Sequence, residues 1–415
     1  MKERQGPAEA PGGTARREFL KLGTGVGAMS MLKLGAGAGA LGMLNACASE
    51  STEEAAGAGA GAGQMTAGMK DAEEVIWEMP QRERSEPISV DVHCHWSPPR
   101  FTNAQAEVGR GGGTDRSLIE QLNENITFMD EKAMDVCIWT VSGRKPWWWL
   151  SPAEAAREAA LVNDAALEAH QAFPERMFQG AEIPANDAKL SLQEMNRVAD
   201  FPSVKGLALP LSMWAQDYIF DPAFEPVLAR AEELGWPLLF HPLDGAVNDY
   251  GGTQSRIGRP LTDDNFIYNT LGFPWDTATV GAKLITYGVL DKFPKLQAVL
   301  PHAGGVFPYI AGRIQHGIER RKHPLGRPFR DYIRQNFWFD TMTYYPEVME
   351  FLVAFAGVDR IMVGTDSSYN RSAYSKEGGR QGRNEWPNAN VEYMKLPADQ
   401  EEAILRGNAV RLFNL

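Results

Sequence analysis

The stretch Asp91-Val92-His93-Cys94-His95 closes an apolar, strand-like run that begins near residue 88. Three later runs of the same kind end at His241, His302 and Asp366. The carboxyl ends of parallel strands meet at one face of an α/β barrel, so these side chains are expected to converge. Imidazole and carboxylate groups gathered there are suitable ligands for a metal ion.

Working outward from these runs, short β-branched segments alternate with amphipathic ones, which is typical of a parallel sheet with helical crossovers. Strands are expected at residues 88–94, 135–141, 177–183, 204–209, 236–241, 296–301, 336–342 and 360–365. Helices are expected at residues 117–132, 152–172, 186–200, 222–234, 277–293, 305–321 and 346–356. The pattern favours an α/β fold, a closed (β/α)8 TIM-type barrel, over an open doubly wound sheet. No Gly-x-Gly-x-x-Gly follows the first strand to indicate a dinucleotide site.

Composition sets the broad class of the protein. Of the 415 residues, 44% are hydrophobic and 23% are charged, as in an ordinary globular enzyme. The formal net charge of −12 leaves no basic surplus to neutralise phosphates, so no nucleic-acid partner is expected. The expected partner is a small-molecule substrate.

Residues 1–47 resemble an export signal and are set apart from the fold. Arg16-Arg17 lies in a twin-arginine-like motif, and a weakly apolar stretch follows at residues 22–46. Lys33 and many glycines make that stretch a poor transmembrane helix. We expect export by the twin-arginine route to the periplasm or cell surface. The alternative is an amphipathic or disordered tail with a chance pair of arginines.

Leu44-Asn45-Ala46-Cys47 looks like a lipoprotein cleavage box, which would make Cys47 the acylated residue and its lipid the only membrane contact. Asn45 departs from the usual small residue, so cleavage by an ordinary signal peptidase nearby is the alternative. Residues 48–70 are mostly Ala, Gly, Glu, Ser and Thr, and residues 48–86 are expected to form a flexible tether and a lead-in to the domain. The catalytic domain is expected at residues 87–415.

Side-chain alternation along the first strand places Asp91, His93 and His95 on one face and Val92 and Cys94 on the other. Two histidines spaced in this way can bind one ion together. The chain has seven histidines, and four of them end strands. The other three are expected to be solvated: His170, His316 and His323.

We assign His93, His95, His241 and Asp366 as ligands of one divalent metal ion. Zn²⁺ is the first choice for three nitrogens and one carboxylate, with Mn²⁺ or Fe²⁺ as alternatives. An open coordination position would hold water and lower the pKa of that water. His302 is interpreted as the catalytic acid/base beside the metal-bound water, with a fifth-ligand or structural role as the alternative.

Several separated motifs extend this pattern along the domain. They are Asp91–Pro99, Phe240-His241-Pro242, Gly272–Thr277, Val289–Leu296, Leu300–Gly305, Val363–Asp366 and Gly407–Phe413. Together they resemble the amidohydrolase superfamily, and more narrowly its branch typified by aminocarboxymuconate-semialdehyde decarboxylase.

The resemblance implies a mononuclear metal barrel, commonly a homodimer, that decarboxylates unsaturated or aromatic acids; other members hydrolyse or hydrate related substrates. Lys205 begins the fourth strand and does not end it, so a bridging carboxylated lysine and a two-metal site are not expected. Glu182 on the third strand could reach the site, but a packed or solvated glutamate is the preferred interpretation.

Two departures from the branch lie where substrate should bind. Ser367-Ser368 follows the metal aspartate where an aromatic residue and proline are common, and Leu243 stands where an aromatic residue is common. The family's known substrates are therefore not transferred. Trp147-Trp148-Trp149 could form a structural plug, a subunit contact or a substrate gate. Candidate arginines for a substrate carboxylate lie in loops: Arg100, Arg110, Arg116 and Arg144.

The sequence therefore predicts an exported, metal-dependent carboxy-lyase with His302 and Asp366 in the catalytic set. The alternative is a metal-dependent hydrolase of a lactone, ester or amide. A third interpretation, a tethered binding protein without turnover, is disfavoured by the intact set of ligands.

Overall fold

The structure is a computed structural model that describes residues 88–107, 112–141, 150–212, 218–242, 268–368 and 388–415. The predictions for residues 1–47 and 48–86, including Cys47, lie outside the described residues, as do those for Arg110, Arg144 and residues 147–149. Among the helices that are described, none combines the length and the apolar character needed to cross a membrane.

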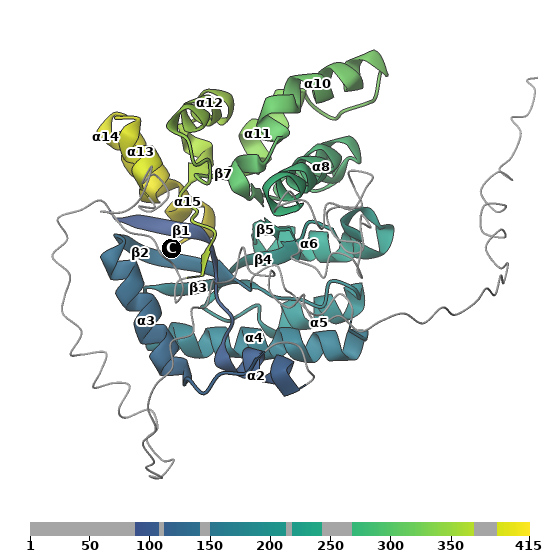
Figure 1. The fold of residues 1–415 in the computed structure, drawn as a ribbon. Helices are drawn as coiled ribbons and strands as arrows, with labels where there is room; N and C mark the ends of the chain where they lie inside the picture. Colours follow the sequence, from purple (N-terminus) through teal and green to yellow (C-terminus); the bar gives the residue numbers. More distant parts are fainter. Residues whose placement is uncertain (1–87, 108–111, 142–149, 213–217, 243–267, 369–387) are drawn as a thin grey trace, which may run out of the picture. The chain divides into compact units, whose positions relative to one another are not determined.

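Parallel strands form the centre of the domain (Figure 1). They are β1 (Ser89–His95), β2 (Met134–Thr140), β3 (Met177–Ala181), β4 (Val204–Pro210), β5 (Leu238–His241), β6 (Ala298–Leu300), β7 (Phe337–Asp340), β8 (Ile361–Met362) and β9 (Ser367–Ser368). From β1 to β8 each strand pairs with the next one in the sequence, and the short β9 pairs with β1.

The chain after β8 brings the two ends of this sheet together. The amide of Val92 donates a hydrogen bond of 3.0 Å to the carbonyl of Val363, and the amide of Thr365 donates one of 3.0 Å to the carbonyl of His93. Eight parallel strands therefore form a nearly closed barrel. This confirms the expected (β/α)8 architecture and brings strand ends far apart in the sequence to one face.

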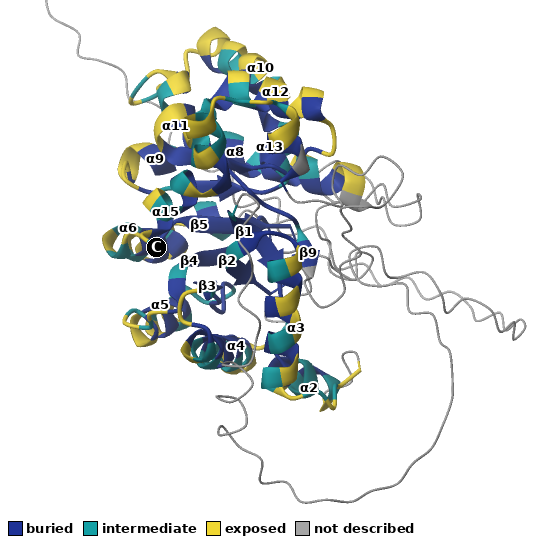
Figure 2. Cartoon of the chain, turned by 90° about the vertical axis from the view of Figure 1, so that its left-hand side faces the viewer, coloured by how far each residue is buried: buried dark blue, intermediate teal, exposed yellow. Residues whose placement is uncertain are grey.

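Helices cover the outside of the barrel, and their inner faces are buried (Figure 2). They are α2 (Pro99–Glu107), α3 (Leu118–Glu131), α4 (Pro152–Ala172), α5 (Ala188–Arg197), α6 (Glu225–Leu234), α8 (Phe273–Thr286), α9 (Val289–Lys292), α10 (Phe307–Arg320), α11 (Phe329–Asn336), α12 (Pro346–Ala356), α13 (Ala389–Tyr393), α14 (Ala398–Glu402) and α15 (Asn408–Phe413). Helices α3 and α4 begin with capping boxes at Ser117 and Ser151, whose side chains accept backbone N–H groups that lack helical partners.

Three local predictions are wrong. Helix α2 contains Arg100, which was expected in a loop. The helix expected at residues 277–293 begins at Phe273 and ends at Thr286, because Gly288 has a positive φ of 72° and separates α8 from α9. Val92 and Cys94 do not share a face: they pack in different apolar clusters, since the strand register shifts between Asp91 and Cys94.

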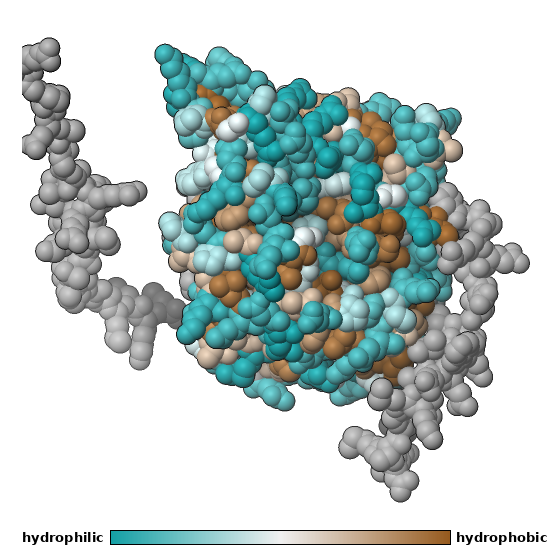
Figure 3. Space-filling model, turned by 180° about the vertical axis from the view of Figure 1, so that it is seen from behind, coloured by the Kyte–Doolittle hydropathy of each residue, from teal (hydrophilic) through white to brown (hydrophobic). Residues whose placement is uncertain are grey.

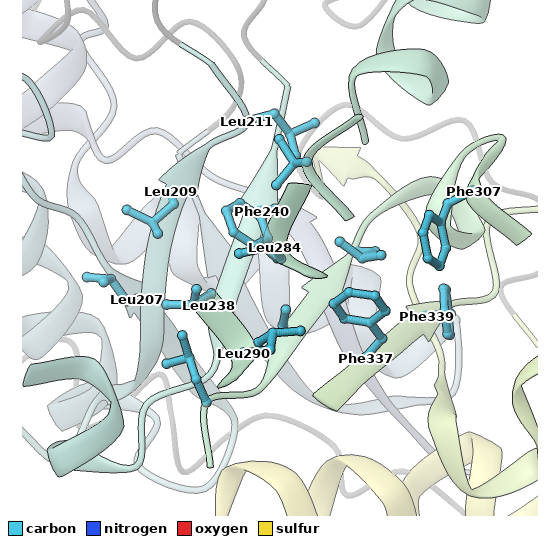
Figure 4. Packing of buried hydrophobic residues seen from close by; sticks show 14 of the residues in the cluster. Leu207, Leu209, Leu211, Leu238, Phe240, Leu284, Leu290, Phe307, Phe337 and Phe339 are labelled. Atoms are coloured by element: carbon cyan, nitrogen blue, oxygen red, sulfur yellow. The ribbon is translucent and has the colours of Figure 1, made fainter. Parts of the chain in front are cut away.

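Alternate strand residues build two apolar layers. Leu238 and Phe240 pack outward against helix residues such as Leu284 and Phe307 (Figure 4). The intervening Leu239 belongs to a second cluster, here called the inner layer, to which most strands contribute a side chain. The inner layer comprises Val90, Val92, Ile138, Phe178, Leu239, Val299, Trp338, Met362, Ala409 and Phe413. Burying each of its large side chains stabilises the fold by about 1.5–3 kcal/mol.

The face opposite to the view of Figure 1 is mostly hydrophilic, with hydrophobic patches between the polar side chains (Figure 3). The bulky apolar side chains that are exposed include Tyr287, Tyr309 and Tyr345. Scattered apolar groups of this kind are normal on a folded domain.

Candidate metal centre

Four predicted ligands meet at the carboxyl ends of the strands. His93, His95, His241 and Asp366 each offer one donor atom, and these atoms all lie within 4.8 Å of one another. The Nε2 atoms of His93, His95 and His241 lie 3.2, 3.0 and 3.5 Å from the same Oδ1 of Asp366. The three imidazoles are buried, and 13% of the Asp366 side chain is exposed. The structure thus brings together the complete set assigned from the sequence.

Each histidine is oriented through its other ring nitrogen. The Nδ1 atom of His93 lies 2.6 Å from Oδ2 of Asp340, and that of His241 lies 2.7 Å from the carbonyl oxygen of Pro242. The Nδ1 atom of His95 is 3.4 Å from the carbonyl oxygen of Thr140. Because these acceptors call for a proton on Nδ1, the Nε2 lone pairs are directed toward the common centre.

The spacing and chemistry of the donors fit a divalent metal ion. Ligand atoms about 2.1 Å from an ion at tetrahedral angles lie about 3.4 Å apart. The observed distances to Asp366 Oδ1 and the 3.1 Å between Nε2 of His95 and Nε2 of His241 are close to that value. Three nitrogens and one carboxylate oxygen suit Zn²⁺ and also accept Mn²⁺ or Fe²⁺.

Electrostatics prepare most of the donors for metal binding. Burial lowers the pKa of His95 and, more strongly, that of His241, so both rings are neutral at pH 7. Burial would raise the pKa of Asp366, but the charge of His93 and hydrogen bonds from His241 and His302 hold it well below its usual range. The carboxylate is therefore ionised.

His93 behaves differently in the metal-free protein. Burial lowers its pKa, but the charge of Asp366 and the hydrogen bond to Asp340 outweigh burial and raise the pKa to about 10. At neutral pH this ring therefore carries a second proton in addition to the one on Nδ1. That second proton must leave before Nε2 can bind a metal ion.

The predicted acid/base lies at the other oxygen of the same carboxylate. The Nε2 atom of His302 is 3.3 Å from Oδ2 of Asp366, whose Oδ1 faces the three other histidines. The ring of Phe273 lies alongside that of His302, with centroids 6.3 Å apart and planes 29° from parallel. Asp366 thus joins His302 to the metal ligands, as the assignment of both residues to the catalytic set requires.

Two strained backbone turns present these groups. Asp366 has a φ of 53°, and its amide donates a hydrogen bond of 2.7 Å to the carbonyl of His93. The neighbouring Thr365 is held by Asp91, whose carboxylate accepts its hydroxyl at 2.7 Å and its amide at 3.2 Å. Positive φ values at non-glycine residues are costly and often mark functional sites.

The second turn contains His302 and Ala303, with φ values of 54° and 55°. Gly305 follows with a φ of 59°, and a Cβ there would lie 2.1 Å from the carbonyl oxygen of Pro274. Only glycine allows this close approach to the start of α8.

Sequence reasoning missed Asp340, the acidic residue that ends β7. Its carboxylate is fully buried and contacts both His93 and the backbone of His302. The signal was present, since Asp340 follows the apolar run Phe337-Trp338-Phe339 as Asp91 and Asp366 follow theirs.

Other predicted residues fall outside the cluster. Lys205 lies near the start of β4, where its Nζ donates to the carbonyl of Asn414. Glu182 is buried and accepts the amide of Val141 at 2.9 Å, which agrees with a packed role. Arg100 and Arg116 pair with Glu168 and Glu124 at the domain surface.

One of the three remaining histidines contradicts its prediction. His170 is buried on α4, and its Nδ1 lies 3.0 Å from the carbonyl oxygen of Met177. The helix faces the barrel at this position, so solvation was the wrong expectation. His316 and His323 are exposed, as predicted.

Eight parallel strands with three histidines and an aspartate at their carboxyl ends define a metal-dependent barrel enzyme. The sequence profile of the amidohydrolase family (Amidohydro_2) matches residues 90–415. The chain belongs to this family.

Three relatives illustrate the match. A 2-amino-3-carboxymuconate-6-semialdehyde decarboxylase of Dictyostelium discoideum is 22% identical over 306 residues, which is 67% of this chain and 81% of the relative. A gamma-resorcylate decarboxylase of Rhizobium radiobacter is 28% identical over 287 residues, 63% of this chain and 77% of the relative. The fold is also similar to a solved structure, that of 5-carboxyvanillate decarboxylase from Novosphingobium aromaticivorans complexed with manganese and 4-hydroxy-3-methoxy-5-nitrobenzoic acid. The two chains are 19% identical in sequence and superpose with a TM-score of 0.63. The match covers 79% of this chain and 96% of that one.

Proposed function

We propose that this protein is a metal-dependent carboxy-lyase that removes CO2 from an aromatic or unsaturated carboxylic acid. One observation carries the proposal: Asp366 directs one oxygen to three converging histidines and the other to His302. This arrangement places a proton-transferring group beside a centre that can hold a ligand oxygen. The decarboxylase names of several relatives support this choice of reaction.

His93, His95, His241 and Asp366 would hold a divalent ion, which would supply Lewis-acid chemistry to the proposed reaction. His302 donates the proton on Nε2 to the carbon that carries the carboxylate. The bond between that carbon and the carboxylate then breaks, its electron pair restores the unsaturated system, and CO2 leaves. His302 regains a proton from water, so one proton is consumed for each CO2 released.

Asp366 and Phe273 serve the proton donor in this scheme. The Oδ2 atom of Asp366 fixes the Nε2 edge of His302. Phe273 covers the ring and limits its rotation. Both contacts keep the donor in one orientation, which is how positioning contributes to the rate.

The test is a mass-spectrometric screen of metal-loaded protein lacking residues 1–47 against unsaturated and aromatic acids, lactones, esters and amides. We expect a product that is lighter than the substrate by one CO2. The His302→Ala variant should not form this product. A product that has instead gained water would contradict the proposal and make the protein a hydrolase. Substrate binding without turnover across the panel would favour a binding protein.

The metal is proposed to be Zn²⁺ or Mn²⁺. The nitrogen-rich ligand set favours Zn²⁺, while the bound manganese of the Novosphingobium enzyme supports Mn²⁺. Elemental analysis of protein purified without chelators, followed by reloading with each ion, should separate these choices by comparing activity per bound ion. Activity that survives complete metal removal would exclude both.

Export by the twin-arginine route, with acylation of Cys47, is proposed for residues 1–47. The motif around Arg16-Arg17, the apolar stretch and the cleavage box support it. Cells fed a labelled fatty acid should label the wild-type chain but not Cys47→Ser. An unlabelled wild type would rule out the lipid, and retention of Arg16→Lys/Arg17→Lys inside the cell would support the export route.

A homodimer is proposed on the resemblance to the family alone. Sedimentation equilibrium of the protein lacking residues 1–47 should give twice the mass of one chain. A monomeric mass at micromolar concentration would contradict it.

A further inference from the structure

Asp340 makes four short contacts from one buried position at the carboxyl end of β7. Its Oδ2 accepts a hydrogen bond of 2.6 Å from Nδ1 of His93 and one of 2.9 Å from the amide of His302. Its Oδ1 accepts the amides of Ala303 at 2.6 Å and Met342 at 3.1 Å. The side chain is fully buried, so these donors replace the water that a carboxylate would otherwise require.

The first contact fixes a metal ligand. A proton on Nδ1 of His93 is shared with Asp340, so the nitrogen left for a metal ion is Nε2. Carboxylates that bind the outer nitrogen of a ligating histidine orient the ring and increase its basicity. Removing such a partner typically lowers metal affinity about 10- to 100-fold.

The next contacts hold the turn that carries the proton donor. His302 and Ala303 both have left-handed backbone angles, which non-glycine residues rarely adopt. Their amides point to the two oxygens of Asp340, which therefore stabilise the strained conformation.

The ring of His302 depends on this turn for its position. Its buried Nδ1 has no hydrogen-bond partner among the described residues. Its Nε2 contacts Asp366, and its ring lies alongside that of Phe273 and close to those of His93 and His241. A change in the backbone of the turn would therefore move the ring, because no contact at Nδ1 would resist the movement.

No residue larger than glycine fits beside Asp340 at position 364. A Cβ at Gly364 would lie 2.6 Å from Cβ of Asp340 and 2.8 Å from Cβ of His93. Glycine on the chain that follows β8 thus allows Asp340 and His93 to lie side by side.

We propose that Asp340 is a positioning residue that sets two halves of the site at once: the ring of the metal ligand His93 and the turn that carries His302. The role in proton transfer rests on the proposed function, whereas the role in metal binding does not. Metal affinity and the rate of the chemical step should therefore depend on one side chain that touches neither the ion nor the substrate.

Asp340→Asn is the decisive variant, because the amide keeps the shape but turns one of the two acceptor positions into a donor. We expect metal affinity, measured by competition with a chromophoric chelator, to fall about 10- to 100-fold. At saturating metal, kcat should fall about 100-fold while KM changes little, as for a misplaced catalytic group. Unchanged affinity in a folded variant would overturn the metal half, and unchanged kcat at saturating metal would overturn the half that concerns His302.

Glu194→Gln is the matched control. Glu194 is also a buried carboxylate, but it binds Asn163 and Arg197 on the helical layer. Its loss should lower the midpoint of thermal unfolding without changing metal affinity or kcat. If this variant reproduced the losses of Asp340→Asn, general destabilisation would explain both and the proposal would fail.

A measurement on the wild-type protein keeps the proposal testable if Asp340→Asn does not fold. In metal-free protein labelled with ¹⁵N-histidine, the Nδ1 proton of His93 should resonate far downfield and exchange slowly, since the contact with Asp340 is short and buried. This result is independent of any enzymatic activity. Absence of the signal would overturn the contact on which the proposal depends.

Discussion

Leu239 and His241 lie two residues apart on β5, and the difference between them shows how the barrel separates stability from chemistry. Leu239 belongs to the inner layer, where it packs with Val299 and Trp338 from the next strands. His241, about 7 Å further along the strand, directs Nε2 to Asp366 and has no place in that layer. The same change occurs on β7, where Trp338 is followed two residues later by Asp340.

One face of a strand thus changes from a structural to a chemical role within two residues. The inner layer is apolar, while the next level contains ionised and hydrogen-bonded groups that would be costly to bury without their partners. Substitutions at the two levels should therefore have separable effects.

His241→Ala should remove a metal ligand and abolish activity. The loss of one of four ligands should leave no tightly bound ion after dialysis, as measured by elemental analysis. The unfolding midpoint of the metal-free protein should change little, because the inner layer is intact. Full metal occupancy in this variant would show that the ligand set is wrong.

His302→Ala should retain the metal but lower kcat by about 100-fold or more, since it removes the proposed acid/base. Elemental analysis and steady-state kinetics on the same sample separate the two effects. Loss of the metal would instead assign His302 as a further ligand, and wild-type rates would remove it from the mechanism.

Leu239→Ala is the partner experiment on the same strand. It should destabilise the fold by about 2–5 kcal/mol, because it leaves a cavity beside Gly180 and Gly206. Urea unfolding measures that loss, while chelator competition at low temperature should show nearly unchanged metal affinity. A large fall in affinity would mean that the two levels are coupled and that the comparison fails.

The smallest expected effect is a gradual dependence on pH. Because the pKa of His93 is raised to about 10 in the metal-free protein, its proton competes with the metal ion. Metal affinity should therefore rise as the pH increases from about 7 toward 10, which chelator competition across that range would measure.

The stability of the metal-free protein should change in the opposite direction. The raised pKa contributes stability that is complete below the ordinary value of 6.5 and is lost as the pH rises through about 10. The difference between the unfolding midpoints of metal-loaded and metal-free protein should thus increase with pH. A difference that stays constant over this range would mean that no proton leaves His93 on metal binding.

Local sequence patterns predicted most of the fold because each strand of a parallel barrel is buried on both faces. Its sequence is therefore a nearly continuous run of apolar residues. Pro152–Ala172 and Pro346–Ala356 are helices with the predicted boundaries. The pattern failed where a local irregularity intervened. A shift of register in β1 separated Val92 from Cys94, and a left-handed glycine divided the helix that follows Phe273.

The sequence by itself determined the fold class and the four candidate metal ligands, because donors directly after apolar strands must lie at one face of a barrel. Only the tertiary structure decided how these donors are held. Closure between Val92 and Val363 brings Asp366 to β1, and Asp340 reaches His93 across 247 positions of sequence. Such contacts depend on the twist and register of all the strands together, which no single stretch of sequence encodes.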